Sequence, residues 1–224
     1  MELGQRLLCV YQRLLERYGP QHWWPAKTRF EVMVGAILTQ AAAWDNVRKA
    51  IDNLEEAGAL SPRAIRDLDE EQLAGLVYPS GYFNAKARKL KALALFLKMR
   101  FDDDLDAMCR EDADTLRGEL LGVHGIGEET ADDILLYAAG KPAFVIDAYT
   151  RRLFHRLGLA PETGPYSTHQ ALFTERLPAD PSLFGEYHAL IVRHGKEVCG
   201  KEPLCEGCCL LEVCPTGRAR TAAE

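Results

Sequence analysis

The carboxyl end of the chain holds four cysteines whose spacing suits a metal centre. The pattern C-x5-C-x2-C-x5-C is formed by Cys199, Cys205, Cys208 and Cys214. Thiolates this close along the chain can enclose a tetrahedral zinc ion or a [4Fe–4S] cluster, and the spacing alone leaves both open. Cys209 is a further thiol within the pattern and could compete as a ligand.

A single carboxylate, Asp147, stands between an apolar run and a helical pattern. Residues 143–146 read Ala-Phe-Val-Ile, and apolar residues recur at helical spacing from Tyr149 to Leu157. We therefore expect Asp147 at the N-cap of a helix, with its side chain facing outward from the packed apolar residues that precede it. Many such residues only cap the helix, because the carboxylate accepts the free N–H groups of the first turn.

A glycine-rich turn precedes Asp147 and could bind an anion. The turn reads Gly-Val-His-Gly-Ile-Gly over residues 122–127, between two segments with helical periodicity. Gly122, Gly125 and Gly127 allow a tight turn and leave backbone N–H groups open to a phosphate at the start of the next helix. Such turns are also common without any ligand.

The elements that position these groups are predicted to be helices. Strand-like alternation is scarce in the 224 residues, and the chain is long enough for one domain or two small ones. Helices are expected over 1–19, over 30–57 with a break near Gln40, and from Asn84 onward. Residues 102–114 hold seven acids and one arginine, which predicts a solvated linker.

Composition limits the environment and the partners. No apolar stretch is long enough to span a bilayer, and residues 1–19 do not resemble a secretory signal. We expect a cytoplasmic, intracellular protein, nucleoid-associated if bacterial, whose thiols serve as metal ligands more than as disulfides.

The charge of the chain is unevenly distributed. The net charge of −6 argues against nonspecific nucleic-acid binding over the whole surface. Lys86 and Arg88 nevertheless begin a basic run, up to residue 100, that contains no acid. This run could contact phosphates or could be a solvated helix face.

The motifs together resemble a known family. The string L-x-G-V-x-G-I-G-x-E-T-A-D, followed by V-I-D-A-Y-T-x-R, is similar to the helix-hairpin-helix DNA glycosylases of the endonuclease III superfamily. The similarity is strongest to the branch that includes 3-methyladenine glycosylases, and it runs from about Trp23 to Cys214. It implies an all-α fold of two helical domains.

The resemblance also implies domain boundaries. A six-helix barrel would span 26–138, with the helix-hairpin-helix over about 113–139. The second helical domain would combine 1–25 with 139–224 and carry a cluster loop over 199–214. DNA would be held by the hairpin, with the target base extruded into the cleft between the domains.

The resemblance assigns roles to individual residues. Asp147 would stabilise the oxocarbenium character of the sugar and activate water. The family glutamine that matches Gln40 fills the space left by the extruded nucleotide, although Ala41–Ala43 replace polar residues usual after it. Trp44 falls where this branch has an aromatic, and it could face the base pocket or only the core.

Two adjacent tryptophans, Trp23 and Trp24, precede a proline. They cannot both face the same side of regular structure, so at least one should be partly exposed. They could wedge two domains together, or line a base pocket where a cationic alkylated purine gains cation–π attraction. The resemblance favours the pocket, since related alkylbase glycosylases have Trp-Trp-Pro here.

The cofactor and partners also follow from the resemblance. The family's cysteine loop holds [4Fe–4S], which favours a cluster over zinc. The expected partner is damaged double-stranded DNA. We expect a monomer that has no membrane association.

Glu129 stands where some relatives have a lysine that attacks the sugar and permits strand cleavage. A carboxylate cannot form a Schiff base. We therefore expect a monofunctional N-glycosylase with little AP lyase activity, acting on alkylated purines. The alternatives are an endonuclease III-type enzyme for oxidised pyrimidines and a noncatalytic DNA-binding protein.

Overall fold

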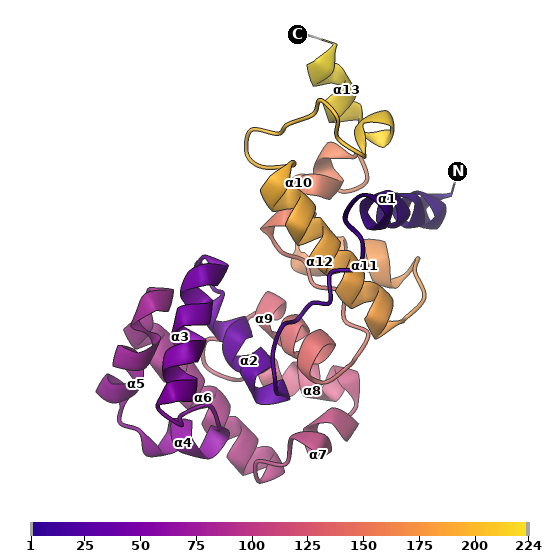
Figure 1. Ribbon diagram of the computed structural model, residues 1–224. Helices are drawn as coiled ribbons and strands as arrows, with labels where there is room; N and C mark the ends of the chain where they lie inside the picture. Colours follow the sequence, from indigo (N-terminus) through magenta and orange to yellow (C-terminus); the bar gives the residue numbers. More distant parts are fainter. Residues whose placement is uncertain (1, 223–224) are drawn as a thin grey trace. The chain divides into compact units, whose positions relative to one another are not determined.

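The computed structural model describes residues 2–222, and this part of the chain forms helices and loops with no strand (Figure 1). The all-α prediction is confirmed. The helices are α1 (Leu3–Tyr18), α2 (Arg29–Leu38), α3 (Trp44–Glu56), α4 (Pro62–Asp67), α5 (Glu70–Val77), η1 (Tyr78–Ser80), α6 (Phe83–Phe101), α7 (Leu105–Arg110), α8 (Ala113–Leu121), α9 (Glu128–Asp133), η2 (Ile134–Ala138), α10 (Ala148–Arg156), α11 (Tyr166–Thr174), α12 (Pro181–Glu197), η3 (Leu211–Val213) and α13 (Pro215–Thr221).

The helices divide into two compact units. One unit is continuous and runs from Trp24 to Lys141. The other combines Met1–Trp23 with Pro142–Glu224. We call them the continuous unit and the split unit. The continuous unit is bounded by residues 24 and 141, and the family resemblance implied bounds of 26 and 138.

Helix α2 is the centre of the continuous unit. Every residue from Phe30 to Leu38 is buried, and the helix packs against α3, α6, α9 and η2. Thr28 caps its first turn by accepting a hydrogen bond from the Glu31 N–H at 3.1 Å. The chain leaves the helix after Leu38, and Ala41 has a positive φ of 52°. The predicted break near Gln40 is therefore present.

The acidic segment 102–114 is not the linker that its composition predicted. It contains α7, and it also contains the start of α8. Asp104 accepts hydrogen bonds from two N–H groups of α7, and Asp112 does the same for α8. The prediction was wrong because the acids stabilise helix starts, where the dipole favours negative charge.

The split unit is built from both ends of the chain. Helix α1 packs on α12, and the Tyr187 hydroxyl of α12 donates to the Leu7 carbonyl of α1 at 2.7 Å. An aromatic core surrounds Tyr187, in which the rings of Phe144 and Phe173 stack with centroids 3.7 Å apart. Helix α10 packs on α12 as well. The chain leaves this core at Asp147.

None of the helices between residues 2 and 222 is long and apolar enough to cross a membrane.

Candidate functional site

The glycine turn joins α8 to α9 as a tight hairpin within the continuous unit. Gly122 ends α8, Gly125 has a φ of +82°, and Gly127 lies at the N-cap of α9. The side chains of Val123 and Ile126 are 8% and 5% exposed, so they anchor the turn in the core. The N-cap residue Gly127 has no side chain to cap the first turn of α9, so N–H groups of that turn can donate hydrogen bonds to an anion.

Gln40 lies against this hairpin. Its amide nitrogen donates to the Thr130 hydroxyl at 2.8 Å and to the Gly125 carbonyl at 3.2 Å. Its amide oxygen accepts a hydrogen bond from the Lys89 ammonium at 2.5 Å. The structure thus brings together two groups that the sequence predicted separately, the glutamine and the hairpin.

Lys86 is not a DNA contact, and that prediction was wrong. Its side chain is 1% exposed, and its ammonium donates to the carbonyls of Leu38 at 2.8 Å and Ser80 at 2.6 Å. Burial, followed by the charge of Lys89, lowers the pKa of Lys86 to about 8. The amine holds the end of α2 against η1.

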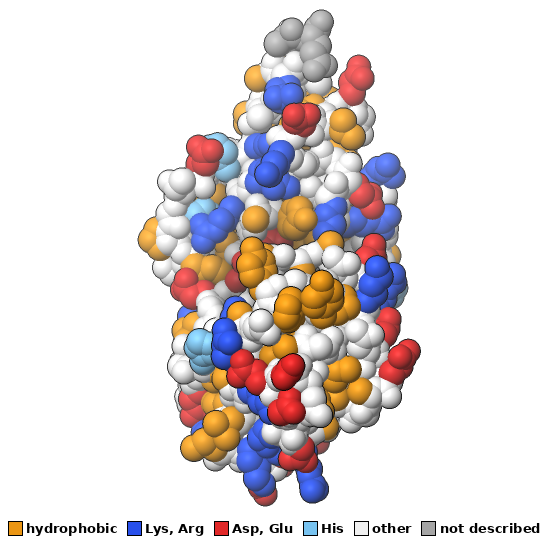
Figure 2. Space-filling model, turned by 90° about the vertical axis from the view of Figure 1, so that its left-hand side faces the viewer, with side chains coloured by type: hydrophobic (Ala, Val, Ile, Leu, Met, Phe, Trp, Pro, Cys, Tyr) orange, Lys and Arg blue, Asp and Glu red, His pale blue; other side chains and the backbone are white. Residues whose placement is uncertain are grey.

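Arg88 is exposed, but it forms an ion pair with Glu70 at 3.1 Å. A phosphate would have to compete with this carboxylate for the guanidinium. On the face drawn in Figure 2, basic side chains are likewise interspersed with acidic ones. A phosphate-binding site on this face would therefore depend on local groups.

Three half-buried aromatic rings meet in the continuous unit. Trp24 makes edge contacts with Trp44 and with Tyr137, at centroid distances of 5.7 and 5.4 Å. Gly35 of α2 makes room for them, since a Cβ there would lie 2.9 Å from the Trp24 ring. We call Trp24, Trp44 and Tyr137 the aromatic cluster. Of the three tryptophans considered for the base pocket, Trp24 and Trp44 are thus brought together. Trp23 is half-buried at the end of a segment of the split unit.

Asp147 occupies the predicted N-cap. It caps α10 by accepting the Thr150 N–H at 2.7 Å, and its side chain is 12% exposed. The preceding residues Phe144, Val145 and Ile146 are buried. The carboxylate therefore stands at the edge of the packed core of the split unit.

His188 of α12 faces this carboxylate and was missed by the sequence reasoning. Its Nε2 lies 3.6 Å from an Asp147 oxygen, and its side chain is 7% exposed. Burial opposes ionisation of Asp147, but the His188 imidazole and the Thr150 N–H outweigh it, so the pKa of Asp147 is lowered. The available signal was a histidine within the apolar stretch Tyr-His-Ala-Leu-Ile-Val over residues 187–192.

Glu129 is exposed in the first turn of α9. An acid in this turn is favoured by the helix dipole, and it supplies no amine.

A second missed residue is Tyr82. It follows Gly81 at the start of α6, has a φ of 47°, and is 74% exposed. Such a backbone conformation is unfavourable for a bulky residue and is a reason to look for a role. An exposed ring held this way can stack on a nucleic-acid base.

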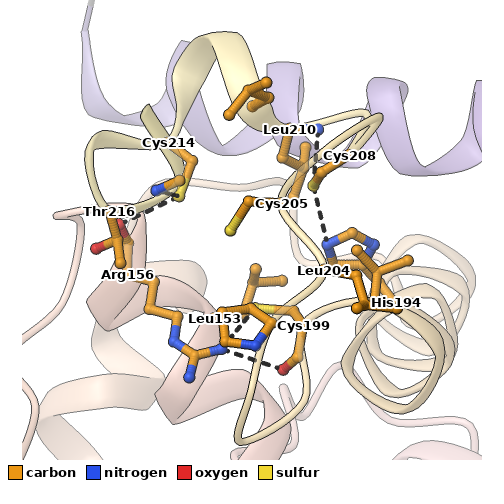
Figure 3. A pocket seen from close by; sticks show the side chains of 14 residues that line it. Leu153, Arg156, His194, Cys199, Leu204, Cys205, Cys208, Leu210, Cys214 and Thr216 are labelled. Carbon is orange, nitrogen blue, oxygen red and sulfur yellow. Dashed lines mark hydrogen bonds between the residues drawn. The ribbon is translucent and has the colours of Figure 1, made fainter. Parts of the chain in front are cut away.

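The four cysteines of the spacing pattern line one cavity (Figure 3). Leucines shield it, among them Leu153, Leu204 and Leu210. Cys209 does not line this cavity. Among residues 2–222, no group of three or more His, Cys, Asp or Glu side chains is arranged to hold a single metal ion.

Two arginines of α10 bind the start of the cysteine loop. Arg152 donates to the Cys199 carbonyl at 2.8 Å, and Arg156 donates to the Gly200 carbonyl at 2.7 Å. Arg156 also lies 3.3 Å from the Cys199 sulfur (Figure 3). Helix α10 thus has Asp147 at its N-cap, and its C-terminal half is attached to the start of the cysteine loop.

Known proteins are similar to the whole chain. The model of the "HhH-GPD superfamily base excision DNA repair protein" family matches residues 34–179. A protein of Methanocaldococcus jannaschii named "Putative DNA repair glycosylase" is 46% identical, over 92% of this chain and 94% of its own.

Solved structures give the same result. Helicobacter pylori 3-methyladenine DNA glycosylase bound to 1,N6-ethenoadenine is 28% identical, with a TM-score of 0.72 over 88% of this chain and 98% of its own. An endonuclease III trapped covalently on DNA has a TM-score of 0.84 over 99% of this chain and 100% of its own. At 21% identity, this second similarity concerns the fold.

Proposed function

Because the chain belongs to the HhH-GPD superfamily of base excision DNA repair proteins, and is thus a DNA glycosylase of the endonuclease III type, we propose that it hydrolyses the N-glycosidic bond of alkylated purines without cutting the strand. Two separate features carry this proposal. The Asp147 carboxylate is nearly buried, and an acid, Glu129, stands at the position where the family resemblance places the lyase lysine.

Asp147 supplies the hydrolytic chemistry. When the bond breaks, its electron pair leaves with the base and the sugar develops oxocarbenium character. An ionised carboxylate stabilises that charge and accepts a proton from the water that attacks the sugar. The lowered pKa of Asp147 supports this role, because it keeps the carboxylate ionised as the pH falls.

The absence of an amine at position 129 argues against strand cleavage. A lyase forms a Schiff base between an amine and the sugar, and Glu129 cannot do so. The carboxylate mechanism leaves an intact abasic strand, which breaks only after treatment with alkali.

The aromatic cluster supports alkylated purines as substrates. Rings that meet edge to face, such as those of Trp24 and Trp44, present π surfaces at a partly exposed site. An alkylated purine carries positive charge, so it gains cation–π attraction that a neutral base lacks. The similar Helicobacter pylori glycosylase, which is bound to ethenoadenine, is a purine-directed relative.

DNA binding is assigned to the hairpin. The uncapped N–H groups of α9 and the exposed Gly122 and Gly127 leave space for a phosphate oxygen. Gln40, held beside them, would fill the space that an extruded nucleotide leaves in the duplex.

We propose that Cys199, Cys205, Cys208 and Cys214 hold a [4Fe–4S] cluster. The cavity that they line is consistent with this group. The Arg156 guanidinium beside Cys199 offsets negative charge on the thiolates. When bound, the cluster ties the 199–214 loop into one rigid element.

The test is a panel of duplexes, each with a single lesion: 3-methyladenine or a stable analogue, thymine glycol, or uracil. Base release is scored separately from strand cleavage. We expect release of the alkylated purine, with strands cut only after alkali. Asp147→Asn should abolish release while retaining DNA binding.

Two outcomes would contradict the proposal. Release of thymine glycol with borohydride trapping of the enzyme on DNA would mean that another amine acts as a lyase. Binding without release from any lesion would favour a noncatalytic DNA-binding protein.

A further inference from the structure

Lys89 differs from the other basic residues of α6 in what its ammonium contacts. Arg88, Lys98 and Arg100 pair with carboxylates, whereas Lys86 and Lys91 donate to backbone carbonyls. Lys89 instead donates to the neutral amide oxygen of Gln40, within the part of the chain that the structure describes.

The stem of Lys89 also covers the hairpin. A Cβ built on Gly125 would lie 2.3 Å from the Cγ of Lys89 and 2.6 Å from its Cδ. These distances are far below van der Waals contact, so the lysine stem occupies the space that a side chain at 125 would need. Gly125 is thus required both by its φ of +82° and by Lys89.

The two ends of the Gln40 amide are held by different parts of the continuous unit. Thr130 and Gly125 of the hairpin accept from its nitrogen, and Lys89 of α6 donates to its oxygen. With donors and acceptors on opposite sides, only one orientation of the amide satisfies all three bonds. Without Lys89 the amide oxygen would lose its partner, and the side chain could adopt other rotamers.

We propose that Lys89 is a positioning residue that orients Gln40 relative to the hairpin, so that phosphate binding at the hairpin and insertion of Gln40 into the duplex occur together. This inference rests on the proposed roles of the hairpin and Gln40. Holding the side chain in one conformation before binding reduces the entropy lost when it inserts.

Double-mutant analysis tests whether Lys89 acts through Gln40. The variants are Lys89→Met, Gln40→Ala and the double variant, with Lys98→Met as a control that removes one exposed cation from the same helix. The probe is a duplex with a tetrahydrofuran abasic analogue beside 2-aminopurine, whose fluorescence reports insertion. This duplex requires no glycosylase reaction, so the outcome is independent of whether the chain hydrolyses any lesion.

We expect Lys89→Met to reduce the inserted fraction of the bound complex, with an insertion equilibrium about fivefold lower, and Lys98→Met to leave it unchanged. In the Gln40→Ala background, Lys89→Met should have no further effect. Equal effects of Lys89→Met in both backgrounds would overturn the proposal, and so would unchanged insertion in Lys89→Met.

If Lys89→Met lowers the melting temperature, Thr130→Val provides the same test from the other end of the amide. It removes an acceptor of the Gln40 nitrogen while retaining the shape of the side chain. Its effect should likewise disappear in the Gln40→Ala background, and an additive effect would again contradict the proposal.

Discussion

Replacement of His188 with glutamine should shift the acid limb of the pH–activity profile. His188 favours the ionised form of Asp147 by hydrogen bonding and by the charge of its ring when protonated, and glutamine keeps similar bulk without that charge. The pKa of Asp147 should therefore rise in the variant. Since the proposed reaction needs the ionised carboxylate, activity should be lost at a higher pH than in the parent.

The magnitude follows from the distance between the two groups. At 3.6 Å and an effective dielectric constant of about 20, unit charges attract by roughly 4 kcal/mol. Burial of both side chains opposes ionisation and leaves a fraction of this value. Even about 1.4 kcal/mol corresponds to a tenfold change in the ratio of ionised to protonated Asp147.

The assay is single-turnover release of the alkylated purine across the acidic range, with each profile scaled to its own plateau. At the pH where the parent has lost half of its activity, the variant should retain roughly a tenth of its plateau, so it should be about fivefold less active than the parent. His155→Gln is the matched control, because it removes an exposed histidine of α10 that lies 4.0 Å from Glu162. Coincident acid limbs for parent and His188→Gln would refute the coupling of these two groups.

Other residues allow further tests. Lys86→Met should lower the free energy of unfolding by about 1–3 kcal/mol, measured with denaturant, because two buried carbonyls lose their donor. Burial, then the charge of Lys89, lowers the pKa of Lys86 to about 8. Between that pH and the ordinary lysine range the unfolded chain binds more protons than the folded chain, so the free energy of unfolding of the parent should rise with pH. The Lys86→Met variant should lack this rise. Gly125→Ala should destabilise by about 1–3 kcal/mol, whereas Gly127→Ala, whose Cβ meets nothing within 4 Å, should change thermal stability little and mainly weaken DNA binding. Cys209→Ser should retain iron and the absorbance at about 400 nm, and Cys205→Ser should lose both; retention of the cluster in Cys205→Ser would exclude that ligand.

Local sequence rules located the main candidate groups. Asp147 could be placed at a helix start because an apolar run and a helical repeat meet there, and both are properties of neighbouring residues. The break at Gln40 was similarly visible. Its hydrogen bonds with Thr130 and Lys89 were not, because they join segments far apart in the chain.

Residue type gave a wrong prediction where the position of a residue on its helix determines burial. Lys86 lies four residues before the buried Leu90 on the same face of α6, so its register places it in the core. Charge alone suggested exposure, and only tertiary structure supplies the carbonyls that make burial possible. The acids of segment 102–114 were misread for a related reason, since a carboxylate caps a helix as readily as it solvates a loop.

The split unit has a consequence for the order of folding during synthesis. Residues 24–141 leave the ribosome as one uninterrupted stretch, so the hairpin can form early. Helix α1 is synthesised before this stretch, yet its partner α12, with the Tyr187 bond to Leu7, is synthesised after it. The chain must therefore close a long loop before the core beneath Asp147 is complete, and such distant contacts form slowly. The nascent protein can thus form the hairpin proposed to contact DNA well before Asp147, the carboxylate proposed to act in hydrolysis, is in place.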